Sequence, residues 1–113
     1  MSGKFCVQII SKKAGSGLIK KLAAGFEGEI KAVVDVKRSI IAAGCEWHDE
    51  ARDMLVKNGS DSDDLWGARV CVKSGDIIFK SQINEGRVGA EKNEICDQEI
   101  RSEVESVIRQ LLI

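Results

Sequence analysis

The chain has 113 residues, of which 43% are hydrophobic and only 4% are aromatic. This length corresponds to one domain that forms its core without disulfide bonds, and the core is expected to be aliphatic. No apolar run approaches the roughly 18 residues that a membrane-spanning helix needs, which excludes a transmembrane protein. The N-terminus has one early lysine, Lys4, and a short apolar run that Gln8 interrupts, so it predicts no signal peptide and we expect a cytoplasmic protein.

The four cysteines are widely spaced and include no Cys-x-x-Cys pair. Zinc sites normally take ligands from such close pairs, so the sequence predicts no zinc site. Three of the four lie in apolar or strand-like stretches, where a free cysteine behaves as a small hydrophobic side chain. We therefore predict free thiols at Cys6, Cys45, Cys71 and Cys96.

The N-terminal part predicts a strand followed by a helix. Residues 4–9 have the period of two that is typical of a strand, and residues 11–17 have the composition of a loop. Ser16 is a candidate N-cap for the helix, which Gly25 and Gly28 end. The apolar residues at helical spacing between them are Leu18, Ile19, Leu22, Ala23 and Phe26.

The next segment predicts a hairpin and a second helix. Two β-type runs, 30–36 and 40–45, are joined by a short turn. Each run contains adjacent apolar residues, which is typical of central strands with both faces covered. The helix follows from apolar residues at positions i, i+4, i+7 and i+8 starting at Trp47, and Asn58-Gly59 ends it.

The C-terminal half predicts a second hairpin and a last helix. Residues 66–73 and 77–83 read as strands around a turn at 74–76. Residues 84–93 contain two glycines and no apolar period, so we predict a long loop, a candidate functional or mobile segment. Asp97 is the expected N-cap of the last helix.

The predicted order is β-α-β-β-α-β-β-α. It indicates an α+β protein with a mostly antiparallel sheet of about five strands and two or three helices. Paired hairpins with interspersed helices favour a packing of the helices on one face of the sheet. Residues 1–113 are expected to form one domain.

His48 is the only histidine, so the sequence contains no pair of histidine metal ligands. It begins the second helix beside Asp49 and Glu50, and a histidine near carboxylates serves as a general base or a metal ligand. Adjacent helical residues point about 100° apart, however, so these carboxylates do not converge on the ring unaided. The alternative is a helix-end residue that is hydrogen-bonded to the backbone.

Two other motifs are incomplete. The alternating aspartates of residues 60–64 resemble the start of a calcium loop, but Trp66 and Val72 take the places of the required glycine and glutamate. Gly15-Ser16-Gly17 lies between a strand and a helix, as phosphate-binding loops do, but Leu18 follows where a P-loop has lysine. We therefore predict no cofactor, no metal and no recognisable catalytic motif.

The net charge of -1 is unevenly distributed. Five lysines and no acid precede Glu27, whereas residues 46–64 contain seven acids. Such asymmetry serves nucleic acid or a charged partner, or it forms two solvated faces. The candidate nucleic-acid contacts are Lys12, Lys13, Lys20 and Lys21, but this segment lacks the interleaved aromatic residues of a single-strand-binding surface.

Short motifs run from about Lys20 to the C-terminus. They are Lys31-Ala32-Val33-Val34-Asp35, then Gly44, Glu46, His48 and Ala51, then Gly59-Ser60, Asp64-Leu65-Trp66-Gly67, Ile83-Asn84, and finally Glu94-Ile95, Asp97 and Glu99-Ile100-Arg101. On these motifs the chain resembles an uncharacterised prokaryotic family known only as a domain of unknown function. The Asp-Leu-Trp-Gly stretch and the single histidine are the most specific marks.

The resemblance implies no activity, but it marks six positions as candidate functional residues. They are Asp35, His48, Asp64, Trp66, Gly67 and Asn84. The chain departs from the family pattern at Arg52, where the family usually has an acid, and over residues 84–93, which lack most of the family's arginines. Such losses would weaken a family site for an anion, or one that depends on an acid.

Three functions are compatible with these observations. The first is a binding or protein-interaction module without catalysis, which self-associates to cover long sheet edges. The second is a small enzyme or ligand-binding protein, which requires His48, Asp35, Asp64 and Asn84 to converge beside a pocket. The third is nucleic-acid association through the basic N-terminal segment, whereas no membrane partner is expected.

Overall fold

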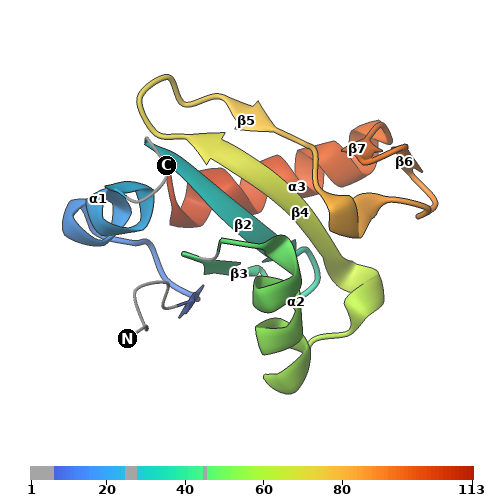
Figure 1. Ribbon diagram of the computed structural model, residues 1–113, viewed down its shortest axis with the longest axis horizontal. Coiled ribbons are helices and arrows are strands. Elements are labelled where there is room, and N and C mark those ends of the chain that lie inside the picture. Colours follow the sequence, from blue (N-terminus) through green and yellow to red (C-terminus); the bar gives the residue numbers. More distant parts are fainter. Residues whose placement is uncertain (1–6, 25–27, 45) are drawn as a thin grey trace.

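The computed structural model describes residues 7–24, 28–44 and 46–113 (Figure 1). It confirms an α+β fold with a mostly antiparallel sheet. The elements are β1 (Gln8–Ile10), α1 (Ser16–Ala24), β2 (Glu29–Asp35), β3 (Ile40–Ala43), α2 (His48–Lys57), the 3₁₀ turn η1 (Ser62–Asp64), β4 (Leu65–Cys71), β5 (Ile77–Ile78), the 3₁₀ turn η2 (Gln82–Asn84), β6 (Ala90–Glu91), β7 (Glu94–Ile95) and α3 (Gln98–Leu111).

The main sheet has the strand order β1-β3-β2-β4-β5, and all of its neighbouring strands are antiparallel. β2 and β4 form its centre and pair along their full length, from Glu29 opposite Cys71 to Asp35 opposite Leu65. β2 and β3 form the predicted hairpin. The two outer strands are short, with three residues in β1 and two in β5.

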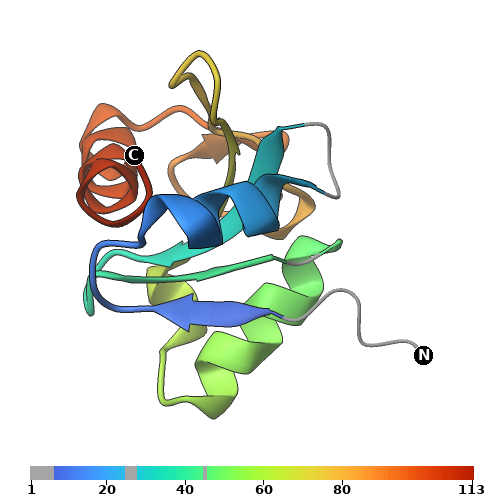
Figure 2. The ribbon, with the colours of Figure 1, turned by 90° about the vertical axis from the view of Figure 1, so that its left-hand side faces the viewer.

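Helices cover both faces of the sheet, with α1 and α3 on one face and α2 on the other (Figure 2). The prediction that all helices pack on one face is therefore wrong. The reason lies in β2, where successive side chains point to opposite faces. Val33 faces α2 and Val34 faces α3, and both are fully buried. The prediction of two covered faces, made from adjacent apolar pairs, is confirmed.

The core is aliphatic, as predicted. On the α1 and α3 face the helices contribute Ile19, Leu22, Ala23, Val104, Val107, Ile108 and Leu111. Each buried Ile, Leu or Val side chain among them stabilises the fold by roughly 1.5–3 kcal/mol. α3 begins where predicted, because the Asp97 carboxylate accepts the backbone N–H groups of Glu99 at 2.9 Å and Ile100 at 3.1 Å.

The segment between β4 and α3 differs from the prediction. The expected strand 77–83 forms a strand only at Ile77–Ile78, and the chain then turns through η2. The expected loop 84–93 includes β6 and ends beside β7, and these strands form a separate two-stranded sheet. An isolated bridge between Lys80 and Glu94 joins this small sheet to the chain that leaves β5.

Some predictions fall outside the described residues. They concern Phe5, Cys6, Gly25, Phe26 and Cys45. The predicted free thiols are confirmed at Cys71 and Cys96. Within the described part of the chain, no helix is long and apolar enough to cross a membrane.

Candidate functional site

Asp35 is fully buried and binds the backbone of the β2–β3 turn. Its Oδ1 accepts the N–H groups of Lys37 at 2.9 Å and Arg38 at 2.8 Å. Its Oδ2 accepts the hydroxyl of Ser60 at 2.6 Å, and that hydroxyl also accepts the Arg38 guanidinium at 2.8 Å. These hydrogen bonds offset the cost of burying the carboxylate, and they fix this turn to the chain that follows α2.

Asn84 is also fully buried and binds the backbone of Gly67 on β4. Its Oδ1 accepts the Gly67 N–H at 2.9 Å, and its Nδ2 donates to the Gly67 carbonyl at 3.0 Å. The side-chain amide thus replaces a neighbouring strand where β5 is absent. Gly67 also allows a close approach of the two segments, because a Cβ there would lie 2.4 Å from Ser81.

Trp66 packs in the core with an exposed fraction of 4%, and Arg87 lies against its ring. The Arg87 guanidinium carbon is 3.7 Å from the ring centroid, and the guanidinium donates to the carbonyls of Leu65 and Asp63. The arginine that remains in residues 84–93 therefore holds this loop to β4. The carbonyl of Asp64 accepts the Val36 N–H at 3.1 Å.

Two of the candidate residues, Asp35 and His48, lie well apart along β4. Asp35 is opposite Leu65 in the sheet, whereas His48 contacts Ala68, three residues further along β4 and thus about 10 Å away. Asn84 is occupied by the backbone of Gly67. Among the residues that the structure describes, no three His, Cys, Asp or Glu side chains are grouped to hold a metal ion. Asp35 and His48, two of the residues on which an enzyme or ligand site depended, therefore lie apart.

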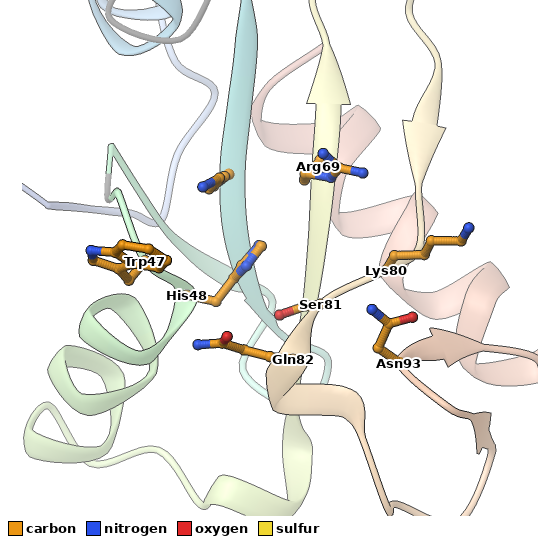
Figure 3. Close-up of a pocket in the computed structure, with 8 residues that line it drawn as sticks. Trp47, His48, Arg69, Lys80, Ser81, Gln82 and Asn93 are labelled. Atoms are coloured by element: carbon orange, nitrogen blue, oxygen red, sulfur yellow. The ribbon is translucent and has the colours of Figure 1, made fainter.

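His48 lies beside a different site, a cleft of about 230 Å³ (Figure 3). Its side chain extends from the first residue of α2 over the sheet, where Nε2 is 2.9 Å from the Ala68 carbonyl oxygen. This contact confirms the alternative of a helix-end histidine bonded to backbone. The residues that line the cleft are Lys31, Trp47, His48, Arg69, Lys80, Ser81, Gln82 and Asn93.

The cleft is open because α2 covers only part of its face of the sheet. α2 packs on β2 and β3, so β4 is left uncovered beyond the start of the helix. Lys31 on β2 and Arg69 on β4 lie directly opposite each other on this face, and both are partly exposed. Two cations thus occupy a cross-strand position, where like charges destabilise a sheet.

The surroundings of His48 keep its ring neutral. Burial lowers the pKa of His48 below its ordinary value of 6.5, although the hydrogen bond to the Ala68 carbonyl opposes this shift. The positive charges of Lys31 and Arg69 lower the pKa further, and Asp49 raises it. A neutral ring that donates Nε2–H to a carbonyl holds its remaining lone pair on Nδ1.

Sequence reasoning found His48 but missed the other lining residues. A signal was present, since Lys31 and Arg69 are cations within apolar strands. That signal became useful only with the register, which places Lys31 opposite Arg69. Lys80, Gln82 and Asn93 come from the segment that was predicted as a strand and a loop.

The fold and the cleft together define a small α+β protein with a cationic surface site. A family model described as protein of unknown function (DUF5674) matches residues 8–111, so the chain belongs to this family. The family resemblance is thereby confirmed, and it starts at residue 8 rather than near Lys20. No curated protein and no solved structure matches the chain.

Proposed function

We propose that this protein is a binding module whose cleft beside His48 holds an anionic group of a small ligand, a phosphate or a carboxylate. The observation that carries this proposal is the pair of cations, Lys31 and Arg69, directly opposite each other at the cleft. A bound anion between them offsets a repulsion that is otherwise unfavourable in a sheet. Lys80 adds a third cation to the lining.

The acid beside Arg69 compensates its charge only in part. Arg69 forms an ion pair of 3.4 Å with Glu29, but both side chains are about a third exposed, and such pairs contribute little. Lys31 donates to the carbonyl of Glu46 at 2.7 Å. Among the described residues, no carboxylate belongs to the lining itself.

The size of the cleft favours a small ligand over a nucleic-acid strand. Its volume of about 230 Å³ is below the roughly 300–1,000 Å³ of pockets for drug-sized molecules. The basic segment also does not extend it, because Lys20 and Lys21 lie on α1, on the opposite face of the sheet. Nucleic-acid association through that segment therefore gains no support from the cleft.

The test is a titration of the ¹⁵N-labelled protein with inorganic phosphate and, separately, with succinate. We expect at least one of them to shift the amide resonances of residues that line the cleft. Arg69→Gln removes charge-assisted hydrogen bonds and should weaken this binding about tenfold or more.

The matched control is Lys20→Gln, which removes the same charge from the opposite face of the sheet. It should bind the anion as the unmodified protein does. Equal affinity in Arg69→Gln, or shifts confined to α1, would contradict the proposal.

A second candidate is a protein interaction, either with a partner or with a second copy of the chain. Its original motive, long sheet edges, is not supported, since β1 and β5 are short. The observation that favours it is that α2 and the residue before it expose Trp47 (55%), Met54 (36%) and Val56 (44%). Light scattering over a concentration series tests self-association, and a constant monomer mass would exclude it.

We also propose a cytoplasmic location. Its support is the pair of unpaired thiols, Cys71 and Cys96, which suit a reducing compartment. Cell fractionation tests it, and recovery of the protein outside the cytoplasm would contradict it.

A further inference from the structure

Trp47 is an exposed aromatic residue at the edge of the cationic cleft. Its exposed fraction is 55%, whereas that of Trp66, the other tryptophan, is 4%. Trp47 lies immediately before α2 and lines the cleft. An exposed indole beside positive charge is a surface on which planar rings stack.

The Trp47 ring lies at one side of the cleft, away from some of the cationic side chains that line it. Figure 3 shows Trp47 on one side, His48 in the middle, and Lys80 with Asn93 on the far side. Lys31 links the two parts, because its ammonium is 5.6 Å from the Trp47 ring centroid and it is opposite Arg69. A ligand that uses the whole cleft therefore has a planar ring at one end and an anionic group at the other.

Side-chain amides add hydrogen-bonding groups to the cleft. Gln82 donates one Nε2–H to Asp49 at 3.0 Å, which leaves its second N–H as a donor and its carbonyl oxygen as an acceptor. Asn93 contributes a second exposed amide. Such groups suit the hydroxyls of a sugar or the polar edge of a base.

We infer that the ligand is a free nucleoside monophosphate, with its base stacked on Trp47 and its phosphate bound by Arg69 and Lys80. This inference rests on the proposed anion binding and names the chemical class of the ligand. The small cleft volume favours a mononucleotide over a strand, since only the sugar and phosphate need to enter it while the base lies against the exposed ring.

The experiment measures calorimetric affinities for ribose 5-phosphate, adenosine 5′-monophosphate and a single-stranded oligonucleotide. Adenosine 5′-monophosphate should bind about tenfold or more tightly than ribose 5-phosphate, because it alone stacks on Trp47. Trp47→Ala should remove this advantage, so that the two compounds bind this variant with about equal affinity. Met54→Ala, which truncates an exposed apolar residue outside the cleft, should change neither affinity.

The outcomes distinguish a failure of the nucleotide inference from a failure of the proposed anion binding. If ribose 5-phosphate binds and the nucleotide binds no better, the ring-stacking inference is overturned while anion binding stands. If neither phosphate compound binds, the inference is overturned, and the proposed anion binding fails with it if succinate does not bind either. Tighter binding of the oligonucleotide than of the mononucleotide would also overturn the inference, because the ligand would then be a nucleic acid.

Discussion

Three buried polar side chains, Asp35, His48 and Asn84, bind the backbone rather than one another. Burial of a polar group is unfavourable unless it is hydrogen-bonded, and each of these groups has found main-chain partners. These hydrogen bonds give a structural reason for the presence of the three residues in the motifs that resemble the family. The residues left for ligand contact are the exposed ones around His48.

Asn84→Ala should destabilise the protein by about 1–3 kcal/mol, because it leaves the buried N–H and carbonyl of Gly67 without partners. Urea denaturation provides the measurement. Asn93→Ala is the matched control, since its exposed side chain lines the cleft, and it should change the free energy of unfolding by less than about 0.5 kcal/mol. An equal effect of both substitutions would refute the role assigned to Asn84.

The single histidine should give a measurable pH dependence of stability. Its pKa in the folded protein lies below the unfolded value of 6.5, so the unfolded chain binds more protons between the two values. The contribution of His48 to the free energy of unfolding is therefore complete above pH 6.5. It is lost as the pH falls from 6.5 through the pKa of the folded protein. An NMR titration of the imidazole measures this pKa directly.

His48→Gln serves as the control for the carboxylates, which also titrate in acid. The difference in unfolding free energy between the two proteins should decrease as the pH falls below 6.5. A bound anion favours the protonated ring, so it should raise the pKa of His48 in the unmodified protein. A folded pKa at or above 6.5 in the ligand-free protein would contradict the burial argument.

Among the helices and strands, the sequence predicted those that depend on residues close to one another in the chain. α3 starts where the Asp97 carboxylate caps it, and the β2–β3 hairpin follows the two apolar runs. The segment after β5 was not predictable in this way, because Asn84 replaces strand pairing with a side-chain amide. No periodicity in the sequence records such a contact between residues far apart in the chain.

Gly67→Ala should test how tightly η2 packs on β4. The added Cβ would lie 2.4 Å from Cβ and Oγ of Ser81 and 3.1 Å from Ile83, so we expect a destabilisation of about 1–3 kcal/mol. Gly17→Ala is the control, because no atom lies within 4 Å of its Cβ and alanine is the better helix former in α1. Thermal unfolding of both variants provides the comparison, and an unchanged melting temperature in Gly67→Ala would show that the turn is loosely packed.

At the scale of the whole molecule, the cleft results from incomplete cover of one sheet face. α1 and α3 bury one face, whereas α2 packs mainly on β2 and β3. The adjacent apolar pairs in the strands predicted two covered faces but not the position of α2 across them. The candidate site was missed for this reason, since the exposure of Lys31 and Arg69 depends on where that helix lies.

The cleft exists only in the folded protein, because Lys31, Arg69 and Lys80 come from β2, from β4 and from the chain beyond β5. A ligand that binds there selects the folded state and must raise its stability. Phosphate, or the tighter of the tested ligands, at about 100 times its dissociation constant should add about 2.7 kcal/mol, which corresponds to a melting temperature higher by on the order of 10 °C.

This stabilisation is measured against chloride at equal ionic strength, so that general screening of surface charge cancels. Lys20→Gln should retain the full increase, because its charge lies on the face covered by α1 and α3. Arg69→Gln should lose most of it, since one of the two opposed cations is gone. An increase of the same size in both variants would mean that the anion acts on the molecule as a whole, and the cleft would no longer be its binding site.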